Sequence, residues 1–434
     1  MKATGAEAIG HIPTTWSVLR LKDVLRQATT LRKTDATQYV GLEQIAGWNG
    51  TAVPIAIGGA GLESAQLIRQ GAICFSKLRP YLAKALVAET DLIVTSELLI
   101  ARPLRLIESA YLLYWLLSHR FIFAINDLVA GTKMPRVDWA TFAGMPVPLP
   151  KLMVQRRIAN WLDLQTTRID KRRELLGRKR SLLSTLKTTI ISEATSRGVD
   201  RTAVMKSSGS STVGLIPKHW HICRLKELTS KIGSGKTPLG GSSIYSPIGV
   251  AFLRSQNVWD DGIRLDDVVY ISDQIHREMN GTKVKPGDIL LNITGASIGR
   301  SALVPETFPE ANVSQHVCII RLRNKSMAGY VALTLLSQFT KAQMAVDQVG
   351  AARDGLNFEN IGRLPIPLPP SEAERKLIVS RLENRVSKIA RQITLIDQLD
   401  DLLKQQRKAI IHEAVTGKID LSTVLLAKVG TQTS

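Results

Sequence analysis

Cysteine is scarce in this chain of 434 residues, and its three cysteines, Cys74, Cys223 and Cys318, stand far apart without a CxxC pair. A disulfide framework or a structural zinc site needs thiols or imidazoles at close, regular spacing. The seven histidines also form no cluster. We therefore expect neither a disulfide framework nor a metal site.

Long hydrophobic runs and acidic residues are also in short supply. No apolar run reaches the roughly 18 residues that a membrane span needs, and the first residues lack the charged-then-apolar pattern of a secretion signal. Lys and Arg total 57 against 37 Asp and Glu, which gives a net charge of +20. These features predict a cytoplasmic protein without a membrane span. Its partner is expected to be a polyanion, with nucleic acid first and an anionic membrane surface second.

An internal repeat is the most informative feature of the sequence. Residues 9–22 (IGHIPTTWSVLRLK) recur as residues 213–226 (VGLIPKHWHICRLK). Further matches follow in the same order, namely Ser96-Glu97 with Ser314-Gln315, 145–150 (MPVPLP) with 364–369 (LPIPLP), and Ile190-Ile191 with Ile410-Ile411. Several matches in register indicate two halves that are built alike and differ in their middles.

Each half ends in a long helical pattern, over 151–197 and over 371–418. Apolar residues recur every seven positions in both stretches, and a heptad sustained this long is typical of a coiled-coil seam rather than of an ordinary amphipathic helix. The predicted seam positions are Leu162, Ile169, Leu176, Leu183, Ile190, Leu382, Ile389, Ile396, Leu403 and Ile410. If each globule keeps its two ends close together, the second helix must run back along the first.

Patterns of strands and short helices precede each long helix, so we predict an α+β fold with an internal pseudo-two-fold repeat. Two mixed α/β globules are joined by two long helices that pair as an antiparallel coiled coil. The predicted segments are a first globule (1–150), the first helix (151–197), a linker (198–212), a second globule (213–370), the second helix (371–418) and a tail (419–434).

Three motifs of the second half form a recognisable set: I-P-x-x-W at 216–220, G-D-I-L-L-N-I-T-G-A-S-I-G at 287–299, and P-I-P-L-P-P at 365–370, which leads into E-R-K-L-I. With two copies of the half, the chain resembles the DNA specificity (S) subunit of a type I restriction-modification system, to about residue 420. The resemblance implies two target-recognition domains, each reading one half of a bipartite DNA target. The helices would set the spacing between the two half-sites.

The same resemblance implies partners for the chain. Two copies of a methyltransferase (M) subunit would dock on the helices, and restriction motor-nuclease (R) subunits would complete the complex. S-adenosylmethionine, ATP and Mg²⁺ would bind those partners, so no cofactor and no catalytic residue are expected on this chain. Double-stranded DNA would be its ligand.

Base reading requires Arg or Lys for guanine and Asn or Gln for adenine. Such residues stand in predicted turns beside strands, where a rigid scaffold can present them. The candidate DNA-binding residues are Lys77, Arg79, Lys84, Lys133 and Arg136 in the first half, and Lys236, Arg254, Ser255, Gln256, Asn257, Asn292, Arg300 and Arg353 in the second. The first helix, with 12 basic and 4 acidic residues over 151–197, suits phosphates of the spacer DNA; a solvated or partner-binding face is the alternative.

Two other interpretations come from different functional classes: a stand-alone nucleic-acid enzyme and a purely structural coiled-coil adaptor. Gly235-Lys236-Thr237 resembles part of a P-loop, but Ser230 stands where that motif needs Gly. Glu374-Arg375-Lys376 resembles a nuclease fragment, but a helix cap explains Glu374 better. The adaptor does not account for two long, different globules or for the positive charge.

Overall fold

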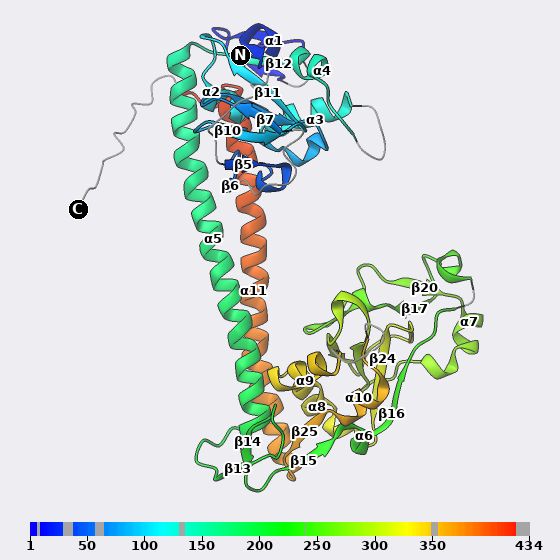
Figure 1. The fold of residues 1–434 in the computed structure, drawn as a ribbon. Helices are drawn as coiled ribbons and strands as arrows, with labels where there is room; N and C mark the ends of the chain where they lie inside the picture. The colour runs from blue at the N-terminus through cyan, green and yellow to red at the C-terminus, as the bar shows by residue number, and fades with distance from the viewer. Residues whose placement is uncertain are drawn as a thin grey trace. The chain divides into compact units, whose positions relative to one another are not determined.

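The structure, a computed structural model, describes residues 1–6, 9–28, 38–56, 65–129, 135–238, 240–348 and 355–421. The chain divides into unit 1, made of Met1–Leu176 with Gln398–Ser434, and unit 2, Gly177–Asp397. The two long helices α5 (Leu152–Arg197) and α11 (Glu372–Val415) each contribute one portion to unit 1 and one to unit 2. Each unit therefore contains one globule and parts of both helices (Figure 1).

Two four-stranded sheets form the globule of unit 1, in the orders β4-β11-β8-β9 and β6-β5-β10-β7. The first sheet is antiparallel throughout, whereas β5 and β10 in the second are parallel. The strands are β4 (Leu25–Gln27), β5 (Gln38–Val40), β6 (Ile55–Ala56), β7 (Ala65–Ile68), β8 (Ile73–Ser76), β9 (Ala85–Val87), β10 (Leu92–Thr95) and β11 (Leu98–Pro103). The two-stranded pairs are β1 (Lys2–Ala3) with β2 (His11–Ile12), and β3 (Ser17–Arg20) with β12 (Pro146–Leu149).

Unit 2 repeats this plan. Its four-stranded sheet has the order β16-β24-β21-β22, and its three-stranded sheet β20-β17-β23 again contains one parallel pair, β17 with β23. The strands are β16 (Thr229–Ser234), β17 (Val250–Leu253), β20 (Val269–Ile271), β21 (Ile289–Asn292), β22 (Ser301–Leu303), β23 (Ala311–Val313) and β24 (Val317–Leu322). The two-stranded pairs are β13 (Met205–Ser207) with β14 (Leu215–Pro217), β15 (His221–Arg224) with β25 (Pro365–Leu368), and β18 (Val258–Trp259) with β19 (Gly262–Ile263).

Short helices complete each globule. Those of unit 1 are α1 (Leu21–Val24), α2 (Ser109–Leu116), α3 (His119–Asp127) and α4 (Trp139–Gly144), and those of unit 2 are α6 (Leu225–Leu228), α7 (Asp273–Glu278), α8 (Ala328–Leu335), α9 (Gln338–Gln348) and α10 (Phe358–Arg363). In unit 1 they cover the buried strand β8, where Phe75 stacks on Phe142 with ring centroids 5.3 Å apart and meets Phe121 edge-on at 5.8 Å. Offset and edge-on aromatic pairs of this kind stabilise a core beyond their buried area.

The long helices pair antiparallel within each unit. In unit 1, Asp170 of α5 lies 3.3 Å from Arg407 of α11, and Arg173, one turn further along α5, lies 2.7 Å from Asp400. The partner numbers fall as the α5 numbers rise, which defines an antiparallel pair. In unit 2, Arg180 bonds Asp397 at 2.6 Å. The predicted α+β fold with two long antiparallel helices is confirmed.

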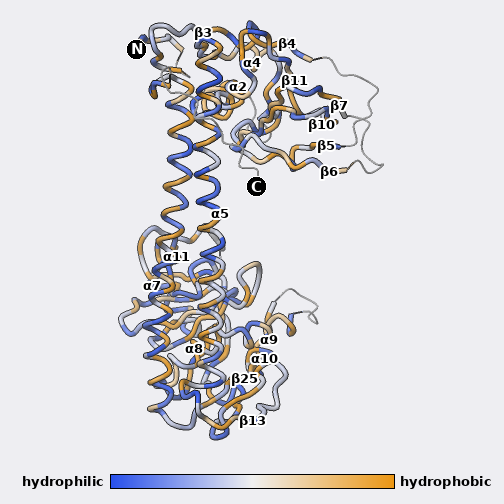
Figure 2. The backbone as a smooth tube through the Cα atoms, turned by 90° about the vertical axis from the view of Figure 1, so that its left-hand side faces the viewer, coloured by the Kyte–Doolittle hydropathy of each residue, from blue (hydrophilic) through white to orange (hydrophobic). Residues whose placement is uncertain are grey.

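The helices are amphipathic along their length, as the alternating colours of the tube in Figure 2 show. The structure buries most of the heptad positions and half-buries Leu176, Leu183 and Ile410. The buried positions are Leu162, Ile169, Ile190, Leu382, Ile389, Ile396 and Leu403. None of the helices in the described residues is long and apolar enough to span a bilayer.

A buried tyrosine fastens each globule to the end of one long helix. In unit 1, the Tyr111 hydroxyl donates to the carbonyls of Pro148 at 2.8 Å and Val415 at 3.2 Å. In unit 2, the Tyr330 hydroxyl donates equivalently to the carbonyls of Pro367 and Thr195. Each globule thus holds the last turn of the long helix that arrives from the other half of the chain.

Candidate DNA interface

Three loops meet at one end of the first sheet of unit 1. Lys77 follows β8, and its main-chain N–H donates to the carbonyl of Glu97, in the turn between β10 and β11, at 2.9 Å. Its side-chain Nζ donates to the Ser96 carbonyl at 2.5 Å. The third loop joins because the Val137 N–H donates to the Lys77 carbonyl at 2.9 Å. The predicted residues Lys77, Arg79 and Arg136 are therefore brought together.

Arg79 has an unusual backbone conformation. Its φ is +49°, in the left-handed region that residues other than glycine seldom adopt. A hydrogen bond of 2.9 Å from its N–H to the Pro135 carbonyl holds this conformation. Backbone strain that the surroundings maintain is typical of functional positions. The side chain is exposed to solvent.

Arg136 and Lys84 already have partners within unit 1. Arg136 forms an ion pair of 3.1 Å with Glu97, and about half of its side chain remains exposed, at 53%. Lys84 is half-buried, and its ammonium group donates to the Leu42 carbonyl. Lys84 thus fixes the turn η1 (Leu42–Gln44) rather than facing outward. Lys133 lies outside the described residues.

Unit 2 places the corresponding loops at the corresponding end of its sheet. The Ile293 N–H, directly after β21, donates to the His316 carbonyl at 3.0 Å, and the Leu356 N–H donates to the Ile293 carbonyl at 2.9 Å. Arg353 itself lies outside the described residues. We call the end of the sheet where these three loops meet the loop edge of a unit. The same three loops of the repeat therefore form the loop edge in unit 1 and in unit 2.

A fourth loop, residues 233–238, joins this edge in unit 2. The Gly235 N–H donates to the Val317 carbonyl at 3.1 Å. A Cβ atom on Gly235 would lie only 1.7 Å from the Val313 carbonyl oxygen, so no other residue fits at this approach. The predicted Lys236 follows and is exposed. The close approach therefore presents Lys236 and Thr237 beside the turn at 314–316.

The predicted residues 254–257 form a turn, η5 (Ser255–Asn257), next to β21. Asn257 and Asn292 are buried, and their amides donate to the main-chain carbonyls of Arg264 at 3.0 Å and Ser255 at 2.7 Å. The structure thus gives these two asparagines a role inside the loops. Arg254 donates to the Asp267 carbonyl at 2.9 Å, and Gln256 bonds the Asp267 carboxylate from an exposed position.

Comparisons with known proteins agree on one family. A family model described as the type I restriction modification DNA specificity domain matches residues 217–405. The type I restriction enzyme MjaVIII specificity subunit of Methanocaldococcus jannaschii is 25% identical over 324 residues, 73% of this chain and 71% of that protein. The EcoKI specificity subunit of Escherichia coli is 24% identical over 222 residues, 48% and 45% of the two chains.

Solved structures support the fold. A chain from a structural study of the assembly and conformational transition of a type I restriction-modification system superposes with a TM-score of 0.70 at 21% identity, over 94% of this chain and 99% of that one. The chain belongs to the family of type I restriction-modification DNA specificity subunits. Such a subunit recognises the DNA target and is not the catalytic component.

Arg300 of this specificity subunit lies beside the hairpin of β18 and β19. Its guanidinium stacks on the Trp259 ring at 4.0 Å from the centroid, and that of Arg264 lies at the same distance. A cavity of about 320 Å³ separates this hairpin from the long helices within unit 2. Its lining includes Arg180 and Lys187 of α5. The lining also includes Asp260, Asp261 and Asp397, so the predicted Arg300 contributes to a cleft of mixed charge beside the helices.

A metal site and a disulfide framework are improbable from the sequence, and the structure describes the residues that bear on both. The described residues contain no group of three or more His, Cys, Asp or Glu that could hold a metal ion. Burial raises the pKa of the Cys74 and Cys318 thiols to about 12, so neither forms a reactive thiolate at neutral pH.

Sequence reasoning missed several polar residues at the two loop edges. Glu97 in unit 1 and Thr237, Thr294, Gln315 and His316 in unit 2 all contact one another or the predicted residues. A signal was present, because Ser96-Glu97 and Ser314-Gln315 match within the repeat and follow β10 and β23 in the same way. Those turns lie opposite the predicted loops only once the sheet is assembled.

Proposed function

We propose that each globule of this specificity subunit reads one half of a bipartite target in double-stranded DNA through its loop edge. The observation that carries the proposal is that the same three loop positions recur in both units with different side chains. Unit 1 presents the charged residues Arg79, Glu97 and Arg136, whereas unit 2 presents the neutral residues Thr294 and Gln315 beside Lys236. A common scaffold with different side chains suits two different half-sites.

Individual roles follow from these surroundings. Exposed Arg79 and Arg136 are suited to guanine, and Glu97 to the amino group of cytosine. Lys236, Arg254, Ser255 and Gln256 are the corresponding candidates in unit 2, and Lys133 and Arg353 stay predictions. Lys77, Lys84, Asn257 and Asn292 support the loops through bonds to main-chain carbonyls.

The long helices would set the spacing between the half-sites and approach the spacer DNA. The cleft of unit 2 has mixed charge, and Lys187 and Arg300 in its lining would offer cations to phosphates. Phosphate contacts strengthen binding and orient a protein on the duplex without reading sequence. Binding through this cleft should therefore weaken steeply as salt concentration rises.

Both units expose leucines on both long helices, and we propose that each such face docks one methyltransferase subunit. Unit 1 exposes Leu164, Leu175, Leu399 and Leu402, and unit 2 exposes Leu182, Leu186, Leu377 and Leu395. Exposed apolar side chains that form a contiguous patch mark protein–protein interfaces. Two equivalent faces suit two copies of one partner.

The remaining partners follow from the family. Restriction motor-nuclease subunits would join the complex, with ATP and Mg²⁺ bound to them and S-adenosylmethionine bound to the methyltransferase subunits. The complex would act in the cytoplasm, where the DNA of the host is accessible.

An exchange of globules tests the proposal. Residues 1–150 are replaced by the first globule of another specificity subunit, and the chain is expressed with its methyltransferase subunits. Sequencing of methylated bases in the host DNA should show one half-site changed and the other retained. The reciprocal exchange of 213–370 is the matched control and should change the other half-site. If either exchange alters both half-sites, the two globules do not read independently.

A further inference from the structure

A chain of hydrogen bonds connects four polar side chains at the loop edge of unit 2. The Thr237 hydroxyl donates to Oε1 of Gln315. The Gln315 amide Nε2 lies 3.0 Å from the His316 ring Nε2, and His316 Nδ1 lies 2.6 Å from the Thr294 hydroxyl. Gln315, His316 and Thr237 are exposed, and Thr294 is half-buried. These hydrogen bonds thus join three different loops at the surface.

This chain of hydrogen bonds fixes the orientation of the Gln315 amide. Its oxygen accepts from Thr237 and its nitrogen donates to His316 Nε2, so the His316 proton lies on Nδ1 and is donated to Thr294. One N–H and one oxygen lone pair of the amide stay available. If every bond of the chain ran in the opposite direction, the amide would still keep one donor and one acceptor.

A donor and an acceptor on one planar amide match the N7 acceptor and N6 amino donor that adenine presents in the major groove. We propose, on the basis of the function proposed above, that Gln315 reads one adenine of the half-site bound by unit 2. Thr237 and His316 act as positioning residues that hold the amide. Holding a flexible side chain in advance lowers the entropy cost of binding.

The corresponding turn of unit 1 supports this role by contrast. The sequence match sets Glu97 against Gln315, whereas the main-chain bonds set it against His316, because the N–H groups of Lys77 and Ile293 donate to the carbonyls of Glu97 and His316. Glu97 pairs with Arg136 at 3.1 Å, and a carboxylate has no donor and cannot make the bidentate contact with adenine. The turn therefore carries different hydrogen-bonding chemistry in the two units, as expected for a segment that determines which base is read.

The test uses the complex of the specificity subunit with its methyltransferase subunits. The wild-type target is first mapped by sequencing of methylated bases. Binding is then measured with duplexes in which 7-deazaadenine, which lacks N7, replaces one adenine at a time in the half-site of unit 2. One replacement should weaken wild-type binding by roughly 5- to 150-fold.

The variant Gln315→Ala should bind the unmodified duplex more weakly by a similar factor and should be indifferent to that same replacement. Thr237→Val keeps the Gln315 amide but removes the hydroxyl group that holds it. This variant should therefore be less sensitive than the wild type to the same 7-deazaadenine, by a smaller factor than Gln315→Ala. Gln274→Ala is the matched control, because Gln274 is an exposed glutamine of α7 that bonds Glu278 at 3.0 Å. It should behave as wild type.

Two results would overturn the inference. In the first, Gln315→Ala remains as sensitive to every 7-deazaadenine as the wild type. In the second, Gln315→Ala binds the unmodified duplex more weakly although no 7-deazaadenine weakens wild-type binding. Either result leaves the proposed function intact if the wild-type target is bipartite. A wild-type target without two separate half-sites would instead refute the proposed function itself.

Discussion

Arg79 combines an exposed side chain with a left-handed backbone, so its contributions to stability and to binding can be separated. Glycine adopts a φ of +49° without the strain that a Cβ atom causes. We expect Arg79→Gly to raise the free energy of unfolding of unit 1 by about 1 kcal/mol while weakening binding to its half-site.

The control for Arg79→Gly is Arg79→Ala, which removes the same side chain and retains the strain. Both variants should lose binding equally, measured by titration of a duplex that carries the mapped target, and only the glycine variant should gain stability in urea denaturation. Equal stability of the two variants would show that the backbone at this position is unstrained.

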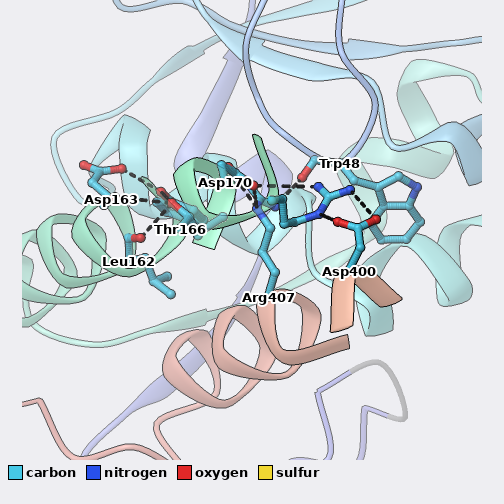
Figure 3. Close-up of polar contacts among 9 residues, drawn as sticks. Trp48, Leu162, Asp163, Thr166, Asp170, Asp400 and Arg407 are labelled. Carbon is cyan, nitrogen blue, oxygen red and sulfur yellow. Dashed lines mark hydrogen bonds and ion pairs between the residues drawn. The ribbon is translucent and has the colours of Figure 1, made fainter. Parts of the chain in front are cut away.

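At the scale of the elements, the ion pairs between α5 and α11 differ in burial. Arg407 in unit 1 is 9% exposed, and it binds Asp170 at 3.3 Å and the Trp48 carbonyl at 2.6 Å (Figure 3). Arg180 in unit 2 is 52% exposed and binds Asp397. Removing one partner of a buried pair leaves an uncompensated charge, whereas an exposed pair contributes little.

Asp170, the partner left behind, is 36% exposed and keeps Arg173 at 3.9 Å. We therefore expect Arg407→Met to destabilise unit 1 by about 2 kcal/mol, less than for a fully buried pair, and the matched variant Arg180→Met to destabilise unit 2 by less than about 1 kcal/mol. Urea denaturation followed by circular dichroism measures the totals, and hydrogen exchange over 398–415 locates the loss. Similar losses of unfolding free energy in the two variants would show that burial does not determine how much each ion pair contributes to stability.

The sequence predicts the elements more completely than the site. The heptads that contain Leu162 and Leu382 locate both helices, because a seam imposes a period that is visible in one dimension. The loop edges depend on which turns the sheets bring together. Lys77 is visible as a basic residue after a strand, but its neighbour Glu97 lies in another turn, and only the antiparallel pairing of β8 with β11 brings them together.

At the scale of the whole molecule, the helices are expected to act as a ruler. Four residues inserted after Ser184 add about one turn, or roughly 6 Å, to α5, which corresponds to one or two base pairs of spacer at about 3.4 Å each. We expect an active complex whose methylated target has a longer spacer.

A single residue inserted at the same place is the control. It turns the following part of the seam by about 100° and should abolish activity or stability. Sequencing of methylated bases measures the spacer for both variants. An unchanged spacer in an active four-residue variant would show that the helices do not determine the distance.

The bond from Tyr111 to the Val415 carbonyl spans 304 residues of sequence, whereas the bond from Tyr330 to Thr195 spans 135. The core of unit 1 includes Ile411, Ala414 and Val415, which the ribosome adds long after the first globule. At about 5–20 residues per second, this core waits at least roughly 15 seconds for its last helix. The globule that is synthesised first is therefore completed last, and its apolar surface needs protection while translation continues.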